Sequence, residues 1–307
     1  MRISINVAHH AWPEGPKGSA AQVERVVAAA DEIGLDSVWV ADHLRQEVRD
    51  DPAGSPDEAV LEAYETLGSL ASRSERVRLG VLAEATAYRS PGLLIRAARA
   101  LDALSGGRAR LGIGAGYGRL AAGTLGSGGS AGNAGSAERT GELLRLAHEL
   151  WPEDGRGGGA SGEERRPPVL VGGTGDARTL PLIARYAEAC DLLDVPDGGA
   201  TLRAKLDILA VHCRKLGRDV SDVDTSVSTL VRPDATADEL VAHCAAFVDY
   251  GLDHVVLVPA GPWTRRTLAT LAAAAPAIRA LGGPPPETLP KVTQLDAYRM
   301  PAARVLV

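Results

Sequence analysis

A strand–helix–strand unit with clearly marked helix ends is the feature that most constrains the fold of this chain. Val77–Leu82 alternates short apolar runs with single polar residues, as a buried strand does. Ser90 then occupies a helix N-cap position and Pro91 the first helical position, where its missing N–H costs nothing. Gly106-Gly107 provides the left-handed C-cap, and Arg108–Ile113 is predicted to form the next strand.

The helix of this unit has an apolar face at helical spacing, opposite Arg96, Arg99 and Asp102. The residues predicted to form that face are Leu93, Leu94, Ala97, Ala98, Leu101 and Leu104.

The same alternation of strand and helix recurs along the chain. Besides the two strands above, the pattern predicts strands at 2–7, 37–40, 169–171, 190–193, 223–230 and 255–258. Helices are predicted at 19–33, 57–72, 137–150, 176–187, 201–216, 237–250 and 263–281. Eight strands, each followed by a helix, favour an α/β fold of the (β/α)8 TIM barrel type over an open doubly wound sheet.

The predicted domain organisation is one barrel domain, residues 1–283, followed by a C-terminal tail, residues 284–307, that lacks a helical pattern. Residues 120–137 carry no charge and are mostly Gly, Ala and Ser, and residues 155–162 are similar. We expect both segments to be mobile loops, and the barrel to carry extended loops at its carboxyl-terminal face.

Composition excludes several classes of function. The 33 basic residues are outnumbered by 39 acidic ones and are scattered along the chain, which argues against a nucleic-acid partner. The three cysteines form no C-x-x-C pair, so we expect neither disulfides nor zinc but a reducing cytoplasm. No signal segment and no long apolar run is present, which argues against secretion or membrane spanning.

The first candidate site is Asp42-His43, directly after the short apolar strand 37–40. Barrel enzymes carry their chemistry at the carboxyl ends of strands. His43 could exchange a proton near neutral pH, while Asp42 could fix its tautomer or bind a polar group of a ligand. The alternative is a structural histidine that bonds a loop carbonyl.

The second candidate is the turn Gly172-Gly173-Thr174-Gly175, which leads from a strand into a helix predicted to start near Asp176. Free N–H groups at a helix N-terminus bind phosphate, although an ordinary tight turn would use the same residues. Gly112, Gly114, Gly116 and Gly118 likewise remove side chains from the end of a strand, which indicates that a ligand approaches this backbone.

Two other motifs fail on inspection. The glycines from Gly112 do not complete G-x-G-x-x-G, because its third glycine would fall on Tyr117 or Arg119. His148-Glu149 begins a zincin motif, but Pro152 occupies the place of the second histidine, so no metal is implied.

Three runs together carry a family resemblance. They are Tyr88-Arg89-Ser90-Pro91, Leu101-Asp102-Ala103-Leu104-Ser105-Gly106-Gly107-Arg108 and Leu111-Gly112-Ile113-Gly114-Ala115-Gly116-Tyr117. This series closely resembles the central signature of the bacterial luciferase-like superfamily, which contains flavin-dependent monooxygenases and oxidoreductases that use the deazaflavin coenzyme F420. The resemblance covers about residues 1–281.

The resemblance implies a cytoplasmic F420-dependent oxidoreductase that transfers a hydride between deazaflavin C5 and a small organic substrate. It places Asp42 and His43 against the ring system, with His43 as the catalytic residue, and the coenzyme phosphate on residues 172–175. It also implies that Ala83, Glu84, Ala85 and Gly114 bind the cofactor, with a cis peptide at the end of the third strand. Glu84 could donate a proton or, as slightly favoured, pair with Arg89.

The resemblance leaves two alternative functions open, and it also predicts a second copy of the chain as a partner. An FMN-dependent monooxygenase would use the same barrel and phosphate loop, and a non-catalytic member would have lost the cofactor. Family members usually carry an acid soon after Gly-Ala-Gly-Tyr, yet this chain is uncharged from 120 to 137, so a second catalytic acid is in doubt. A homodimer is also expected from the resemblance.

Overall fold

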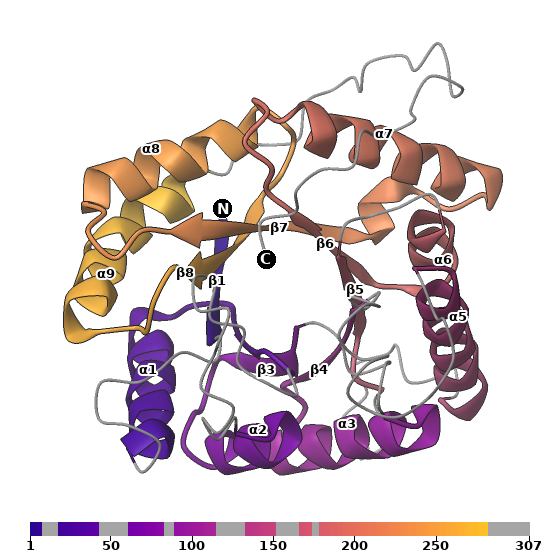
Figure 1. Ribbon diagram of the computed structural model, residues 1–307, viewed down its shortest axis with the longest axis horizontal. Coiled ribbons are helices and arrows are strands. Elements are labelled where there is room, and N and C mark those ends of the chain that lie inside the picture. The colour runs from indigo at the N-terminus through magenta and orange to yellow at the C-terminus, as the bar shows by residue number, and fades with distance from the viewer. Residues whose placement is uncertain are drawn as a thin grey trace, which may run out of the picture.

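The chain forms a closed barrel of eight parallel strands surrounded by helices (Figure 1). The structure is a computed structural model and describes residues 1–7, 18–42, 61–82, 89–114, 133–151, 166–173 and 178–281. The strands are β1 (Arg2–Val7), β2 (Ser37–Val40), β3 (Arg78–Val81), β4 (Ala109–Gly114), β5 (Val169–Gly173), β6 (Ala189–Leu193), β7 (Asp224–Val231) and β8 (His254–Pro259). Each strand pairs with the next, and β8 closes on β1. The predicted (β/α)8 barrel is therefore confirmed.

Helices lie around the outside of the barrel (Figure 1). They are α1 (Ser19–Ile33), α2 (Ala63–Ala71), α3 (Pro91–Ser105), α5 (Asn133–Leu150), α6 (Thr179–Tyr186), α7 (Ala200–Lys215), α8 (Ala237–Val248) and α9 (Arg265–Ala280), with a short 3-10 turn η4 (Val220–Asp222) before β7. None of the helices in the described ranges is both long and apolar enough to cross a membrane.

The ends of α3 follow the sequence prediction. The Ser90 side chain accepts a hydrogen bond from the Leu93 N–H, and Gly106 caps the other end with φ 66°. The predicted apolar face is wrong in part, because Leu93 is 54% and Leu104 67% exposed, whereas Ile95 is buried. At about 100° per residue, Leu93 and Leu104 lie on one flank of a stripe centred elsewhere. The stripe consists of Leu94, Ile95, Ala98, Leu101 and Ser105.

Three other helices begin three or more residues away from the predicted position. Helix α2 begins at Ala63, well after position 57, because Glu62 has an extended backbone and caps the helix. Helix α6 begins at Thr179 rather than Asp176, which places Pro181 in the first turn, where no N–H is needed. Helix α5 begins at Asn133, inside the segment predicted to be a loop. The rest of 120–137, the segment 155–162 and the tail 284–307 lie outside the described residues.

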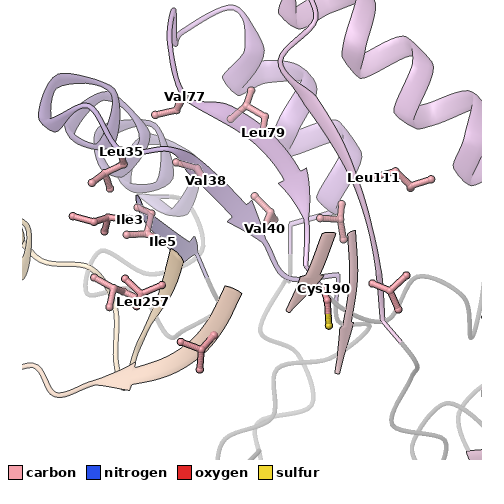
Figure 2. Close-up of a cluster of buried hydrophobic side chains, with 14 of the residues drawn as sticks. Ile3, Ile5, Leu35, Val38, Val40, Val77, Leu79, Leu111, Cys190 and Leu257 are labelled. Carbon is pink, nitrogen blue, oxygen red and sulfur yellow. The ribbon is translucent and has the colours of Figure 1, made fainter. Parts of the chain in front are cut away.

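The main core lies between the strands and the helices, and Figure 2 shows part of it. Outward-facing residues such as Ile5, Val38, Val40 and Leu79 belong to this cluster. Since side chains alternate across a strand, Trp39 points the other way, into the barrel. There it forms a second cluster with Leu82, Leu170 and Val256.

Two glycines make room for this indole inside the barrel. A Cβ on Gly80 would lie 2.6 Å from Trp39 Cζ3, and a Cβ on Gly112 would lie 3.2 Å from the same atom. The Gly112 Cβ would also lie 1.6 Å from the carbonyl oxygen of Val81. Neither position can therefore carry a side chain unless the backbone shifts.

We predict that Gly112→Ala lowers the free energy of unfolding by about 3 kcal/mol, because the added methyl group has no space. Urea denaturation would measure this. Gly68→Ala is the matched control, since a Cβ there meets nothing within 4 Å. In the middle of α2 it should instead stabilise by roughly 0.5–1 kcal/mol. Equal effects of the two substitutions would contradict the packing argument.

Candidate functional site

The candidate site lies at the carboxyl ends of the barrel strands. All eight strands run parallel, so the segments that follow them meet at one end of the barrel. Asp42 follows β2, Glu62 directly precedes α2, and Arg89 precedes α3. These three residues come from two successive strand-to-helix connections.

A buried ion-pair cluster joins these connections. Arg89 donates from Nε to Asp42 Oδ2 at 3.0 Å and from Nη2 to Asp42 Oδ1 at 2.9 Å, which is a bidentate pair. The same Nη2 group donates to Glu62. The side chains of Asp42 and Arg89 are only 5% and 17% exposed, so the pair is shielded from solvent. One guanidinium therefore orders two carboxylates, and one of them, Asp42, immediately precedes His43 in the sequence.

Tyr64 contributes an aromatic ring beside this cluster. The Arg89 guanidinium carbon is 5.6 Å from the centre of the Tyr64 ring, which is a cation–π distance. The Tyr64 hydroxyl is buried and has no hydrogen-bond partner among the residues that the structure describes. Burial, followed by the nearby Asp42 charge, raises the pKa of this phenol well above its ordinary value, so the hydroxyl keeps its proton. It is a buried donor available to a ligand.

Glycines occupy neighbouring strand ends on the other side of the site. Gly114, the last residue of β4, is in register with Gly172 of β5. A Cβ on Gly172 would lie 3.1 Å from Leu82 Cδ1 and 3.8 Å from the Asp191 Cβ. The strand ends at Gly173, and α6 begins at Thr179 with its first N–H groups unpaired within the helix. The ends of β4 and β5 thus carry no side chains of their own.

A buried acid beside Gly172 was missed by the sequence reasoning. Asp191 faces the barrel interior from β6, where Ser226 and Ser228 each donate a hydrogen bond to it at 2.6 Å. Burial raises its pKa to about 6, although both hydroxyls act in the opposite direction. The available signal was an acid within an apolar strand together with Ser-x-Ser in the next strand.

Asn6 contributes a second unused polar atom. It lies on β1, its side chain is buried, and its Oδ1 atom has no hydrogen-bond partner within the described ranges. Its register partner on β2 is Trp39, so both side chains face the barrel interior.

The remaining predicted site residues lie outside the described residues. These are His43, Ala83, Glu84, Ala85, Thr174 and Gly175. The predicted cis peptide falls in the same gap; the described peptide bonds are all trans. The Glu84–Arg89 pair therefore stays a prediction, while no sequence pattern indicated the observed Arg89 partners, Asp42 and Glu62. Among the described residues no cluster of His, Cys, Asp or Glu could hold a metal ion.

We predict that Arg89→Met lowers the free energy of unfolding by about 3–5 kcal/mol, because it leaves the Asp42 and Glu62 carboxylates without this counter-charge. Arg73→Met is a matched control that removes an exposed pair with Glu24 and should cost no more than about 1 kcal/mol. Chemical denaturation measures both. Similar losses in the two variants would show that the Asp42–Arg89 pair is not structurally important.

The geometry can now be compared with known proteins. The family model described as luciferase-like monooxygenase matches residues 1–282. A curated F420-dependent glucose-6-phosphate dehydrogenase of Microbacterium testaceum is 29% identical over 214 residues, covering 66% of this chain and 61% of the relative. A putative coenzyme F420-dependent oxidoreductase of Mycobacterium tuberculosis is 28% identical over 196 residues, covering 64% and 48%. The chain thus spans less than two-thirds of the length of these relatives.

A solved structure supports the fold. An F420-dependent secondary alcohol dehydrogenase in complex with an F420-acetone adduct aligns with a TM-score of 0.73 over 91% of this chain and 99% of that one, at 16% identity. At this identity the similarity concerns the fold alone. The family model covers nearly the whole chain and agrees with the eight-stranded barrel, so the chain belongs to the luciferase-like monooxygenase family.

Proposed function

We propose that this protein is an F420-dependent oxidoreductase that acts on a small organic substrate. The observation that carries the proposal is the placement of Asp42, which Arg89 holds at the carboxyl end of β2 immediately before His43 in the chain. The names of the curated relatives support the choice of coenzyme.

The described residues fit a flat cofactor with a phosphate-bearing tail. Gly114 and Gly172 leave the ends of β4 and β5 without side chains of their own, and the Leu82 side chain packs against Gly172. A ring system at these strand ends would meet backbone together with the Leu82 side chain. The Tyr64 hydroxyl and Asn6 Oδ1 are buried polar atoms without partners in the described part of the chain, and a ligand could supply partners for them.

Each residue would have a distinct task. Asp42 and Arg89 would orient the segment that carries His43, and His43 would donate or accept the proton at the substrate. Gly172–Gly175 and the first turn of α6 would bind phosphate through backbone N–H groups. Ala83, Glu84 and Ala85 would position the ring from the end of β3. Coenzyme F420, when bound, supplies or accepts the hydride at its C5 atom.

A second candidate keeps the same fold but uses FMN as a monooxygenase. The description of the family model favours it. A non-catalytic member is the third possibility, and the uncharged segment 120–137 remains its support. A cofactor titration separates these three.

Two further expectations belong to this proposal. The three cysteines are free and buried, which fits a reducing cytoplasm. The homodimer expected from the family resemblance stays a prediction, and sedimentation of the purified protein would test it.

We predict that the purified protein binds F420 at least about tenfold more tightly than FMN, a difference of about 1.4 kcal/mol. Quenching of coenzyme fluorescence during titration measures both affinities. Tighter binding of FMN would support the monooxygenase, and binding of neither coenzyme by a folded protein would support the non-catalytic alternative.

For the F420-loaded enzyme we predict that His43→Ala lowers turnover by about 10² to 10⁴, with a much smaller loss of coenzyme affinity, because the residue transfers a proton. The wild-type pH limb near about 6.5 should vanish in the variant. His212→Ala on α7 is the matched histidine control. Unchanged turnover with weakened coenzyme binding would instead identify His43 as a cofactor-binding residue.

A further inference from the structure

A pocket lies at the amino-terminal end of the barrel, away from the candidate functional site. It has a volume of about 120 Å³. A single buried water needs only about 10–15 Å³, so the pocket has room for a small ligand. Its lining includes Ser37, Arg78 and His254, which are the first residues of β2, β3 and β8, and Arg110, near the start of β4.

The Trp39 cluster separates the two ends of the barrel. Trp39 and Leu170 line the pocket and also pack with Leu82 and Val256 in the barrel interior. Leu82 directly follows β3 at its carboxyl end, where it lies beside the Gly172 position. The pocket therefore does not belong to the candidate active site.

Several charges around this pocket already have partners. Arg78 donates to Asp36 at 2.6 Å, and Arg2 donates to Asp224 at 2.6 Å. Glu188 accepts from Arg166. The acidic side chains of the lining are thus each matched by an arginine.

His254 is held by hydrogen bonding within the same region. Its Nε2 atom lies 2.8 Å from the Ser4 hydroxyl, and its Nδ1 atom lies 3.8 Å from Asp224. The Ser37 hydroxyl donates to Asp36 at 2.7 Å, and the Ser226 hydroxyl donates to Asp191. These groups are therefore occupied by protein partners.

Arg110 differs from the other arginines of the pocket. It donates a hydrogen bond to the Ala109 carbonyl at 3.1 Å, and within the described part of the chain no carboxylate lies close enough to form an ion pair with it. Burial, followed by the nearby positive charge of Arg78, lowers the pKa of Arg110 to about 10. The Asp36, Asp224 and Asp102 carboxylates act in the opposite direction but do not offset the burial of this half-buried guanidinium, so an anion in the pocket that bonds it directly would be stabilised.

We propose that this pocket binds a small oxyanion, a phosphate or a short carboxylate, through the guanidinium of Arg110. A planar guanidinium offers a fork of N–H donors that matches two oxygens of such an anion. The volume admits a small anion but excludes a nucleotide. Asp36 and Asp224 also line the pocket and repel an anion. The attraction of a dianion to Arg110 and Arg78 must therefore outweigh the repulsion from these two carboxylates.

The test is thermal unfolding of the full-length protein in increasing inorganic phosphate, with acetate in parallel, at constant ionic strength maintained with chloride. The wild-type melting temperature should rise and saturate with at least one of the two anions, as mass action requires for a single site. Arg110→Met should reduce the affinity for that anion at least about tenfold, and Arg110→Lys should retain part of it. Arg266→Met removes an exposed positive charge of α9 and should bind as the wild type does.

A second measurement, the stability of the variant without phosphate or acetate, distinguishes anion binding from a purely structural role of Arg110. Without phosphate or acetate, Arg110→Met should be at least as stable as the wild type, because burial disfavours the charged guanidinium and no ion pair among the described residues offsets that cost. A variant that is less stable in both buffers, with an unchanged anion response, would overturn the proposal. So would a wild-type response that fails to saturate or that Arg110→Met reproduces. Equilibrium dialysis with labelled phosphate or acetate gives the same comparison without relying on stability.

Discussion

The packing of Trp39 inside the barrel is the interaction on which the rest of the structure depends. A parallel barrel of eight strands encloses a space that side chains must fill. In this protein one indole occupies much of that space, and Gly80 and Gly112 on the next two strands leave room for it. The same indole divides the interior into two polar regions, one near the carboxyl ends of the strands and one near the amino ends.

The arginines at the two ends of the barrel differ in their ion pairing. At the carboxyl end, Arg89 holds two carboxylates, Asp42 and Glu62, so that acids outnumber the cation in the described cluster. At the amino end, Arg110 faces the pocket without an ion-pair partner among the described residues. Charge that is balanced inside a fold stabilises it, whereas charge left over marks a place where a ligand can contribute.

How much could be predicted from the sequence depended on whether the determining interactions were local. The ends of α3 were predictable because the cap, the proline and the glycine act within one helical turn. The buried side of α3 was predicted less well, because Leu93 and Leu104 fit an apolar pattern that the neighbouring elements do not cover. The Arg89 pair with Asp42 joins residues 47 positions apart, and no local pattern reports such a contact.

Strand register explains what the sequence could not show about the interior. Asp191 meets Ser226 and Ser228 only because β6 and β7 pair in this register, and a shift of one residue in β7 would turn both serines toward the helices, away from Asp191. Gly114 likewise becomes part of a side-chain-free surface only because it is aligned with Gly172. Pairing of adjacent strands thus brings together, in the barrel interior, polar residues and glycines that lie far apart in the sequence.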